Sequence, residues 1–399
     1  MITKEQLCSI CFEQIIPKWH SMPDTFPVFL QSFSQEENYA NEAFLDNFIP
    51  ELQKIIPVIT QNPSKEQIEN MKQKMHEIIE KENILHIKDH ISKELFCEFE
   101  ENTECFMERA KAFDEKLSME NIWQAMRNYF IYAIISNLQG ERQNCRDTIL
   151  GYSLLYPYTD NYIDELHRKS ADKNSYNDLI RKTLLGEDIT PNNDYEEKTK
   201  QLLKLVLNHY SEDSCKQKET SLLLLLMLEA QEKSILQIHR FGIKRLSTEE
   251  ILRISTYKGG LSVLLDYLFS IDFDAASVTQ DDIFFYLCFG LILQLADDLQ
   301  DITEDKKKHS QTLMTICRHK KMLEATVNRL LHFTQTCITD FSPKNPQLHN
   351  FMLQNCQLML LAAVAQNTKY FSKSYLEKIE PHLPFSISYM EHLQKTNFI

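Results

Sequence analysis

Helical periodicity runs along almost the whole chain, and very few turn-forming residues interrupt it. Only 7 glycines and 12 prolines are spread over 399 residues. A many-stranded sandwich, or a series of nucleotide-binding loops between strands and helices, would need more of both. We find no runs of alternating polar and apolar residues, no internal repeat and no low-complexity tract. The sequence therefore predicts an all-α protein.

Polar segments rich in Pro, Asn and Asp divide this pattern into stretches of helix length. The clearest breaks fall at residues 60–67, 184–194, 239–247, 271–282 and 340–347. Residues 1–140 are charge-rich and amphipathic, whereas residues 141–399 hold the longer apolar segments. We expect an N-terminal helical layer (1–140) packed on a catalytic helical bundle (141–399), with no linker that would make them independent domains.

The balance of charge argues against two classes of partner. The net charge is −14, and an acidic surface repels both nucleic-acid phosphates and anionic lipid headgroups. The longest apolar runs, 222–230 and 358–365, are much shorter than the ~20 residues of a membrane span, and the N-terminus is too polar for a secretory signal. We expect a cytoplasmic protein with no nucleic-acid partner and no stable membrane insertion.

Ten cysteines are scattered along the chain, and Cys8 and Cys11 form the only close pair. No second pair completes the ligand set of a zinc site. We therefore expect ordinary reduced thiols rather than a redox or metal centre.

The segment "LILQLADDLQDITED", residues 291–305, places carboxylates directly behind an apolar run. At ~100° per residue, the acids gather on one side of a helix and the leucines and isoleucines on the other. Like charges one turn apart destabilise a helix, and lysines follow only at 306–308. A divalent cation with oxygen ligands would balance the charge, and a solvated helix end is the alternative. The stripe consists of Asp297, Asp298, Asp301 and Asp305, with Glu304 at its edge.

A second acidic pair lies in "YPYTDNYIDELHRKS", residues 156–170. Asp160 and Asp164 are one helical turn apart, Asn161 is beside them, and Arg168 follows two turns after Asp160. The apolar and aromatic face of this predicted helix therefore ends in side chains whose oxygen atoms can bind a metal ion. An ordinary pair of surface acids is the alternative.

The third unusual segment is "RISTYKGGLSVLLDYLF", residues 253–269. Gly259 and Gly260 each cost a helix about 1 kcal/mol, so the pair predicts a helix break where a ligand or another backbone comes close. Lys258 would then donate to an anion. A plain helix end with a glycine cap explains the segment as well.

Together these segments resemble a known superfamily. "GLILQLADDLQD" is similar to the second aspartate-rich motif of trans-prenyl diphosphate synthases and class I terpene synthases, and "YTDNYID" resembles the first, with Asn161 where chain-elongating enzymes usually carry Asp. "YKGGLSVLLD" is similar to a segment of bacterial large-terpene synthases, the class IB enzymes that include tetraprenyl-β-curcumene synthase. The resemblance covers roughly residues 145–320; residues 1–140 carry none of it.

The resemblance implies an isoprenoid-synthase-type helical bundle around a deep apolar pocket, with extra N-terminal helices. Its mouth would hold about three Mg²⁺ ions and the substrate diphosphate. The implied metal ligands are Asp160, Asn161 and Asp164 on one wall and Asp297, Asp298 and Asp301 on the other, with Asp305 binding through water. The implied diphosphate donors are Lys258 and Arg168. The implied pocket residues are Ser153, Tyr156, Tyr286, Phe289 and Gly290.

The implied activity is that of a magnesium-dependent terpene synthase, a carbon–oxygen lyase in isoprenoid biosynthesis. It would ionise a linear prenyl diphosphate, geranylgeranyl or longer, and release a cyclic or acyclic terpene. The alternative is a chain-elongating synthase that uses isopentenyl diphosphate; Asn161 and the absence of Arg-Arg-Gly after the first motif argue against it. A third alternative is a catalytically silent helical binding protein. The resemblance is compatible with a homodimer.

Overall fold

The predicted all-α class is confirmed by the computed structural model. The structure describes residues 2–29, 31–59, 64–142, 144–164, 170–238, 245–274 and 277–395. Within these ranges every regular element is a helix, and the only β-type pairing is an isolated bridge between Ile238 and Ser310. None of the helices in the described part of the chain has the length and apolarity needed to cross a membrane.

Four of the predicted breaks lie between consecutive helices. They separate α3 (Gln35–Ile59) from α4 (Lys65–Lys81), α9 (Ser170–Leu184) from α10 (Asp194–Asn208), α13 (Leu261–Ser270) from α14 (Gln280–Gln300), and α16 (Lys320–Asp340) from α17 (Gln347–Gln366). Side chains of the break segments cap the following helices: Ser64, Asn193 and Thr279 each accept a hydrogen bond from a backbone N–H in the first turn. These caps explain why the helices begin where the polar segments end.

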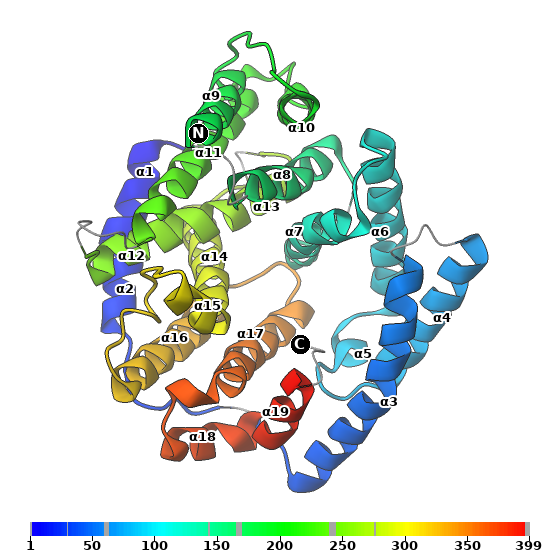
Figure 1. Ribbon diagram of the computed structural model, residues 1–399, viewed down its shortest axis with the longest axis vertical. Helices are drawn as coiled ribbons and strands as arrows, with labels where there is room; N and C mark the ends of the chain where they lie inside the picture. Colours follow the sequence, from blue (N-terminus) through cyan, green and yellow to red (C-terminus); the bar gives the residue numbers. More distant parts are fainter. Residues whose placement is uncertain are drawn as a thin grey trace.

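Helix α14 is the central element of the bundle (Figure 1). It packs against α13, α16 and α17 and against the short π-helix η3 (Thr256–Gly260). Ile292, Leu295 and Leu299 are fully buried, so the apolar side predicted for this segment faces the core. The elements around it are α7 (Met119–Leu138), α8 (Asp147–Asp164), α11 (Ser214–Ser234) and α12 (Thr248–Ser255).

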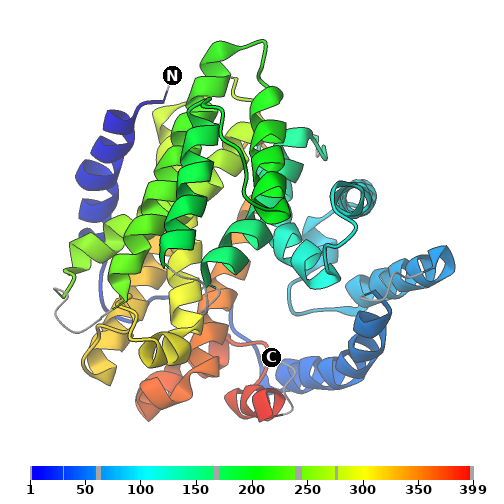
Figure 2. The same cartoon turned by 45° about the horizontal axis from the view of Figure 1, so that its top comes forward.

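The first helical segment of the chain lies along one side of this bundle (Figures 1 and 2). It runs without interruption through α1 (Lys4–Ser9), the π-helix η1 (Ile10–Ile15) and α2 (Ile16–Ser21). Its apolar face is buried, and Trp19 packs edge-on against Phe333 of α16 with ring centroids 5.6 Å apart. The N-terminal segment is thereby part of the main core.

Helices α3 and α4 lie on the opposite side and extend away from the body (Figures 1 and 2). The chain returns through α5 (Ile87–His90) and α6 (Lys93–Phe113), and α6 packs on α7 and α8. Helix α7 precedes residue 140, the boundary we expected from the sequence, yet it packs against α8 and α13. It is therefore built into the bundle.

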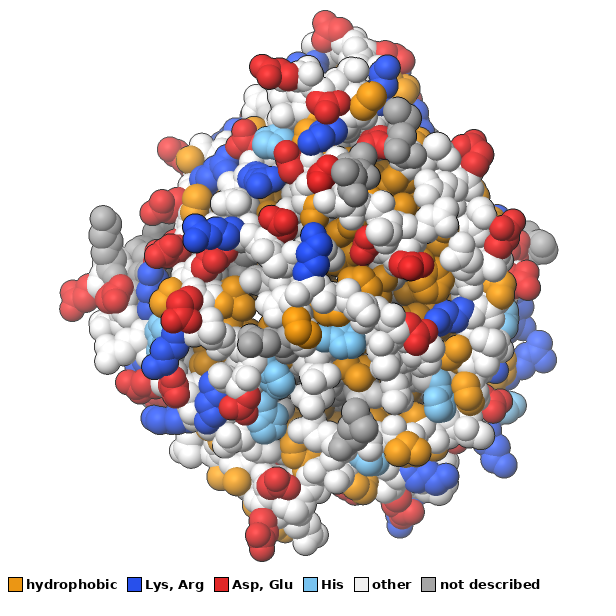
Figure 3. Space-filling model, turned by 180° about the vertical axis from the view of Figure 1, so that it is seen from behind, with side chains coloured by type: hydrophobic (Ala, Val, Ile, Leu, Met, Phe, Trp, Pro, Cys, Tyr) orange, Lys and Arg blue, Asp and Glu red, His pale blue; other side chains and the backbone are white. Residues whose placement is uncertain are grey.

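The C-terminal helices complete the fold beneath α14. They are α15 (Ile302–Lys307), α16, α17, α18 (Lys373–Ile379) and α19 (Ile387–Lys395), with the 3₁₀ turns η4 (Thr368–Tyr370) and η5 (Glu380–His382). A further 3₁₀ turn, η2 (Ile235–Gln237), follows α11. Acidic and basic side chains are interspersed on the face seen from behind, with small groups of hydrophobic side chains between them (Figure 3).

Candidate active site

The Lys-Gly-Gly segment forms a π-helical turn rather than a helix break or a helix end. Thr256–Gly260 is η3, and it joins α12 directly to α13. A π-turn inside an α-helix is rare and is often found at a functional site. It carries Lys258, whose side chain is half-buried.

The glycines of this turn contact the backbone of α14. A Cβ atom added to Gly290 would lie 2.6 Å from the carbonyl carbon of Gly259 and 2.6 Å from the Cα of Gly260. A Cβ added to Gly260 would lie 2.8 Å from the carbonyl oxygen of Leu287. Only glycine permits this approach, so η3 and α14 are fixed against each other at van der Waals distance.

A cavity of about 430 Å³ lies beside this contact, in the interior of the bundle. It extends between α7, α8, α9, α10, α11, η3, α13 and α14. Its apolar lining consists of Ile131, Leu155, Ile180, Leu184, Leu203, Leu224, Met227, Leu228, Val263 and Leu293. Its polar lining consists of Gln124, Arg127, Asn128, Tyr152, Tyr156, Thr159, Gln231, Lys258, Ser262, Gln294 and Asp297. A concave site that combines apolar walls with polar groups is the usual form of a small-molecule site, and the polar residues are numerous in this one.

Charged groups gather where the cavity opens to solvent. Asp297 of α14 and Arg127 of α7 are both exposed and both line the cavity, together with Lys258. The surrounding walls raise the pKa of Asp297 by removing water from it, and the neighbouring Asp301 raises it further. Lys258 and Arg127 act in the opposite direction. The mouth thus holds a carboxylate and two cations within electrostatic reach of one another.

The acidic stripe continues from α14 into α15. Asp301 stands at the junction of the two helices, with φ −89° and ψ 10°. The backbone N–H of Asp301 donates to Asp297 (2.8 Å), and that of Asp305 donates to Asp301 (2.9 Å), so the three residues stay stacked. Burial, together with Asp301 and Asp297, raises the pKa of Asp305 to about 6. The side chains of Asp297, Asp301 and Asp305 therefore still repel one another in the folded protein.

Asp298 differs from its neighbours because it is buried. One carboxylate oxygen accepts a hydrogen bond from Nε2 of Gln294 (3.0 Å), whereas Oδ2 has no partner among the described residues. Burial raises the pKa of Asp298 to about 7, and Lys258 opposes this shift. A buried carboxylate oxygen without a partner is costly, and a bound cation would remove that cost.

Two of the five predicted pocket residues, Tyr156 and Gly290, line the cavity. Ser153, Tyr286 and Phe289 are not among its lining residues; all three are buried in the core. For Tyr286 and Phe289 the reason is the side of α14 on which they lie. The face of α14 that lines the cavity comprises Gly290, Leu293, Gln294 and Asp297.

The two aromatic residues of α14 pack against other rings instead. Tyr286 stacks on Tyr267 with ring centroids 4.2 Å apart, and its hydroxyl accepts a hydrogen bond from Gln139. Phe289 stacks parallel to Phe285. These rings stabilise the bundle below the cavity.

The first acidic motif is placed only by its backbone. Asp160, Asn161 and Asp164 belong to the last turns of α8, but their side chains lie outside the described part of the structure, and Arg168 lies outside the described residues altogether. Thr159, one residue earlier, lines the cavity. The end of α8 therefore lies at the cavity, and the metal-binding role of its acids remains a prediction.

Sequence reasoning missed the contribution of α7. Gln124, Arg127 and Asn128 all line the cavity, and they come from the part of the chain in which no motif was recognised. The available signal was their spacing: polar residues at i, i+3 and i+4 on a helix whose other buried positions are mostly apolar.

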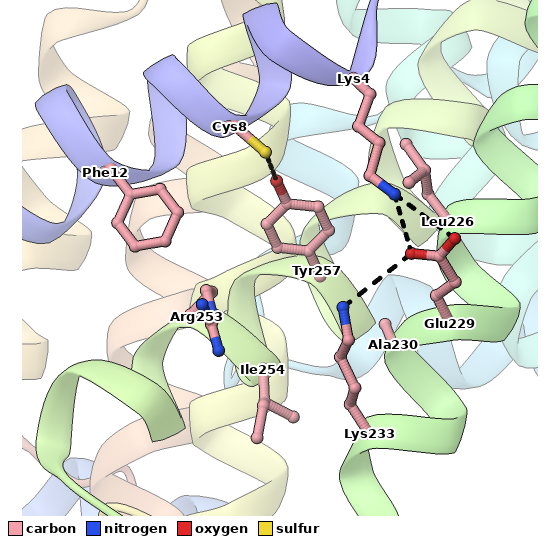
Figure 4. Close-up of a pocket in the computed structure, with 10 residues that line it drawn as sticks. All are labelled: Lys4, Cys8, Phe12, Leu226, Glu229, Ala230, Lys233, Arg253, Ile254 and Tyr257. Carbon is pink, nitrogen blue, oxygen red and sulfur yellow. Dashed lines mark hydrogen bonds and ion pairs between the residues drawn. The ribbon is translucent and has the colours of Figure 1, made fainter.

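A second, smaller pocket of about 100 Å³ lies on the outer side of η3 (Figure 4). The thiol of Cys8 lies 3.0 Å from the hydroxyl of Tyr257, and Glu229 pairs with Lys4 and Lys233 (Figure 4). These contacts attach the N-terminal helix to α11 and to the π-turn. All ten cysteines are free thiols.

A comparison of the chain with models of protein families, with curated proteins and with solved structures finds no match.

Proposed function

We propose that this chain is a magnesium-dependent terpene synthase that ionises a linear prenyl diphosphate and releases a terpene and diphosphate. One observation carries the proposal: an apolar cavity whose exposed end holds Asp297, Lys258 and Arg127. The cavity suits a hydrocarbon chain, and its mouth suits an anionic headgroup. The resemblance of the three sequence segments supports the same chemistry.

The acidic stripe fits magnesium. Of its members only Asp297 lines the cavity; Asp298, Asp301 and Asp305 are not among the lining residues. They offer hard oxygen ligands, and the unpartnered Oδ2 of Asp298 and the raised pKa values of Asp297, Asp298 and Asp305 favour a positive charge close by. Among the described side chains, no three His, Cys, Asp or Glu residues form a metal site, so substrate phosphates and water must complete the coordination, as is usual for Mg²⁺. The proposed ligands are Asp297, Asp298, Asp301 and Asp305, together with Asp160, Asn161 and Asp164, which the resemblance implies.

Lys258 and Arg127 would bind the diphosphate directly. Each donates charge-assisted hydrogen bonds to an anion, and both already lie near Asp297. When bound, magnesium supplies Lewis acidity that stabilises the charge developing on the leaving group. The carbon–oxygen bond breaks, its electron pair leaves with diphosphate, and the hydrocarbon is left as a cation.

The apolar walls would hold this cation away from water until it loses a proton. The ring of Tyr156 lines the cavity and can stabilise a nearby cation. The cavity of about 430 Å³ has room for a prenyl chain. We therefore keep the geranylgeranyl or longer diphosphate that the resemblance implies as the proposed substrate.

The test is incubation of the full chain with Mg²⁺ and geranyl, farnesyl or geranylgeranyl diphosphate, singly, followed by hexane extraction and gas chromatography. We expect a hydrocarbon or alcohol, with the highest yield from geranylgeranyl diphosphate. A product that forms only when isopentenyl diphosphate is added would establish chain elongation instead. An absence of product and of diphosphate binding would overturn the proposal.

A further inference from the structure

Asn128 of α7 joins three helices at the inner wall of the cavity. Its Nδ2 donates to Oγ of Ser153 on α8 (3.1 Å) and to Oδ1 of Asp266 on α13 (3.1 Å). All three side chains are buried. Because both amide hydrogens are engaged, the amide group is fixed in one orientation.

The hydrogen bond from Asn128 is the one polar contact that the structure shows for Asp266 among the described residues. Asp266 is fully buried, and its Oδ2 has no partner there. Burial raises the pKa of Asp266 well above the usual range. A buried polar atom without a partner destabilises a protein, and an apolar side chain of similar volume would avoid that penalty.

Asp266 and Ser153 hold the side chain of Asn128 in one orientation. Asn128 lines the cavity, and Ser262, one turn before Asp266 on α13, lines it too. With Nδ2 occupied, the carbonyl oxygen is the remaining polar atom of the side chain, and none of the described residues donates a hydrogen bond to it. A fixed carbonyl dipole in an apolar cavity stabilises positive charge without any reorganisation.

We infer that Asn128 is a catalytic residue that directs its side-chain carbonyl at the hydrocarbon cation, and that Asp266 and Ser153 are its positioning residues. The inference rests on the proposed terpene synthase function. It adds an uncharged, buried cation-stabilising group that follows Arg127 by one residue on α7, and predicts that the group decides how far the cation is converted before it loses its proton.

The experiment compares Asn128→Leu, Asp266→Leu and Asp266→Asn with the wild type, using Mg²⁺ and the prenyl diphosphate that the wild type converts fastest. We expect Asn128→Leu and Asp266→Leu to lower kcat about tenfold or more, with little change in KM, and to shift the product mixture toward early-released acyclic compounds. Asp266→Asn, which is neutral and still accepts a hydrogen bond, should keep the wild-type product ratio.

The melting temperature separates this role from a structural one. Asp266→Leu should melt at or above the wild-type temperature while its products change. Asn328→Leu is the matched control, because Asn328 is equally buried but lies on α16, outside the cavity lining; it should affect stability and leave the product ratio unchanged.

An unchanged product ratio in Asn128→Leu or in Asp266→Leu would overturn the inference, as would an Asp266→Asn variant that behaves like Asp266→Leu. A wild-type chain that makes no product from any prenyl diphosphate would instead overturn the proposed function. The two failures are therefore distinguishable.

Discussion

Gly290 of α14 and Gly259 of η3 are in backbone contact, and neither position has room for a side chain. Lys258 adjoins this contact on one side, and Asp297 lies seven residues along α14, about 10 Å at 1.5 Å per residue. The glycine contact therefore determines how the cation of η3 is placed relative to the carboxylates at the cavity mouth.

Replacing Gly290 with alanine should separate η3 from α14. Because the added methyl group meets backbone atoms rather than a flexible side chain, we expect a loss of about 1–3 kcal/mol in the free energy of unfolding and a larger loss of activity. Denaturant titration and turnover of the prenyl diphosphate measure the two effects. Gln300→Ala, an exposed change on the same helix, is the control. A variant with wild-type stability would contradict the close contact.

Replacing Lys258 or Arg127 with methionine should weaken substrate binding. Each removes one positive charge from the mouth, and both charges act on Asp297. We expect KM for the prenyl diphosphate to rise about tenfold or more, since hydrogen bonds to a charged group contribute about 1.5–3 kcal/mol. Lys204→Met, at an exposed position on α10, should leave KM unchanged. If Arg127→Met also leaves KM unchanged, α7 does not contribute to headgroup binding.

Replacing Asp297 with asparagine should abolish most of the turnover and weaken the response to magnesium. We expect kcat to fall about 100-fold or more, the scale found when a group that stabilises developing charge is removed. The stabilisation of the protein by Mg²⁺, followed as a melting-temperature shift with and without EDTA, should fall with it. Glu304→Gln is the matched control: Glu304 is exposed and pairs with Lys307. An active Asp297→Asn variant would refute the metal assignment.

The metal-free protein should lose stability as the pH rises toward neutrality. Folding raises the pKa of Asp298 to about 7 and that of Asp305 to about 6, against about 3.9 for an unfolded aspartate. The folded state therefore binds more protons between these values, and the free energy of unfolding decreases as the pH rises through this window. The contribution is fully present below about pH 4 and is lost above about pH 7.

The variant Asp298→Asn isolates this effect, because asparagine does not titrate. Its melting temperature relative to the wild type should increase between pH 5 and pH 8, and added Mg²⁺ should reduce the difference at pH 8. A difference that stays constant over this range would show that Asp298 is not protonated in the folded protein.

Local pattern was sufficient for much of the fold. The scarcity of glycine and proline predicted an all-α chain, and the polar breaks predicted where several helices end, because capping and chain-breaking residues act within one turn. Local sequence patterns also predicted that the apolar side of residues 291–305 faces the core, and they identified Lys258 and Asp297 as candidate site residues.

Only the tertiary structure brought α7 to the cavity, placed Asn128 between Ser153 and Asp266, and turned Lys-Gly-Gly into a π-turn against Gly290. It also buried Tyr286 and Phe289 away from the cavity lining. The physical reason is that periodicity specifies which face of a helix is apolar, whereas the partner of that face depends on packing against other helices, from about 25 to more than a hundred positions away. Close packing, backbone contact and the pairing of buried polar groups exist only once those distant helices meet.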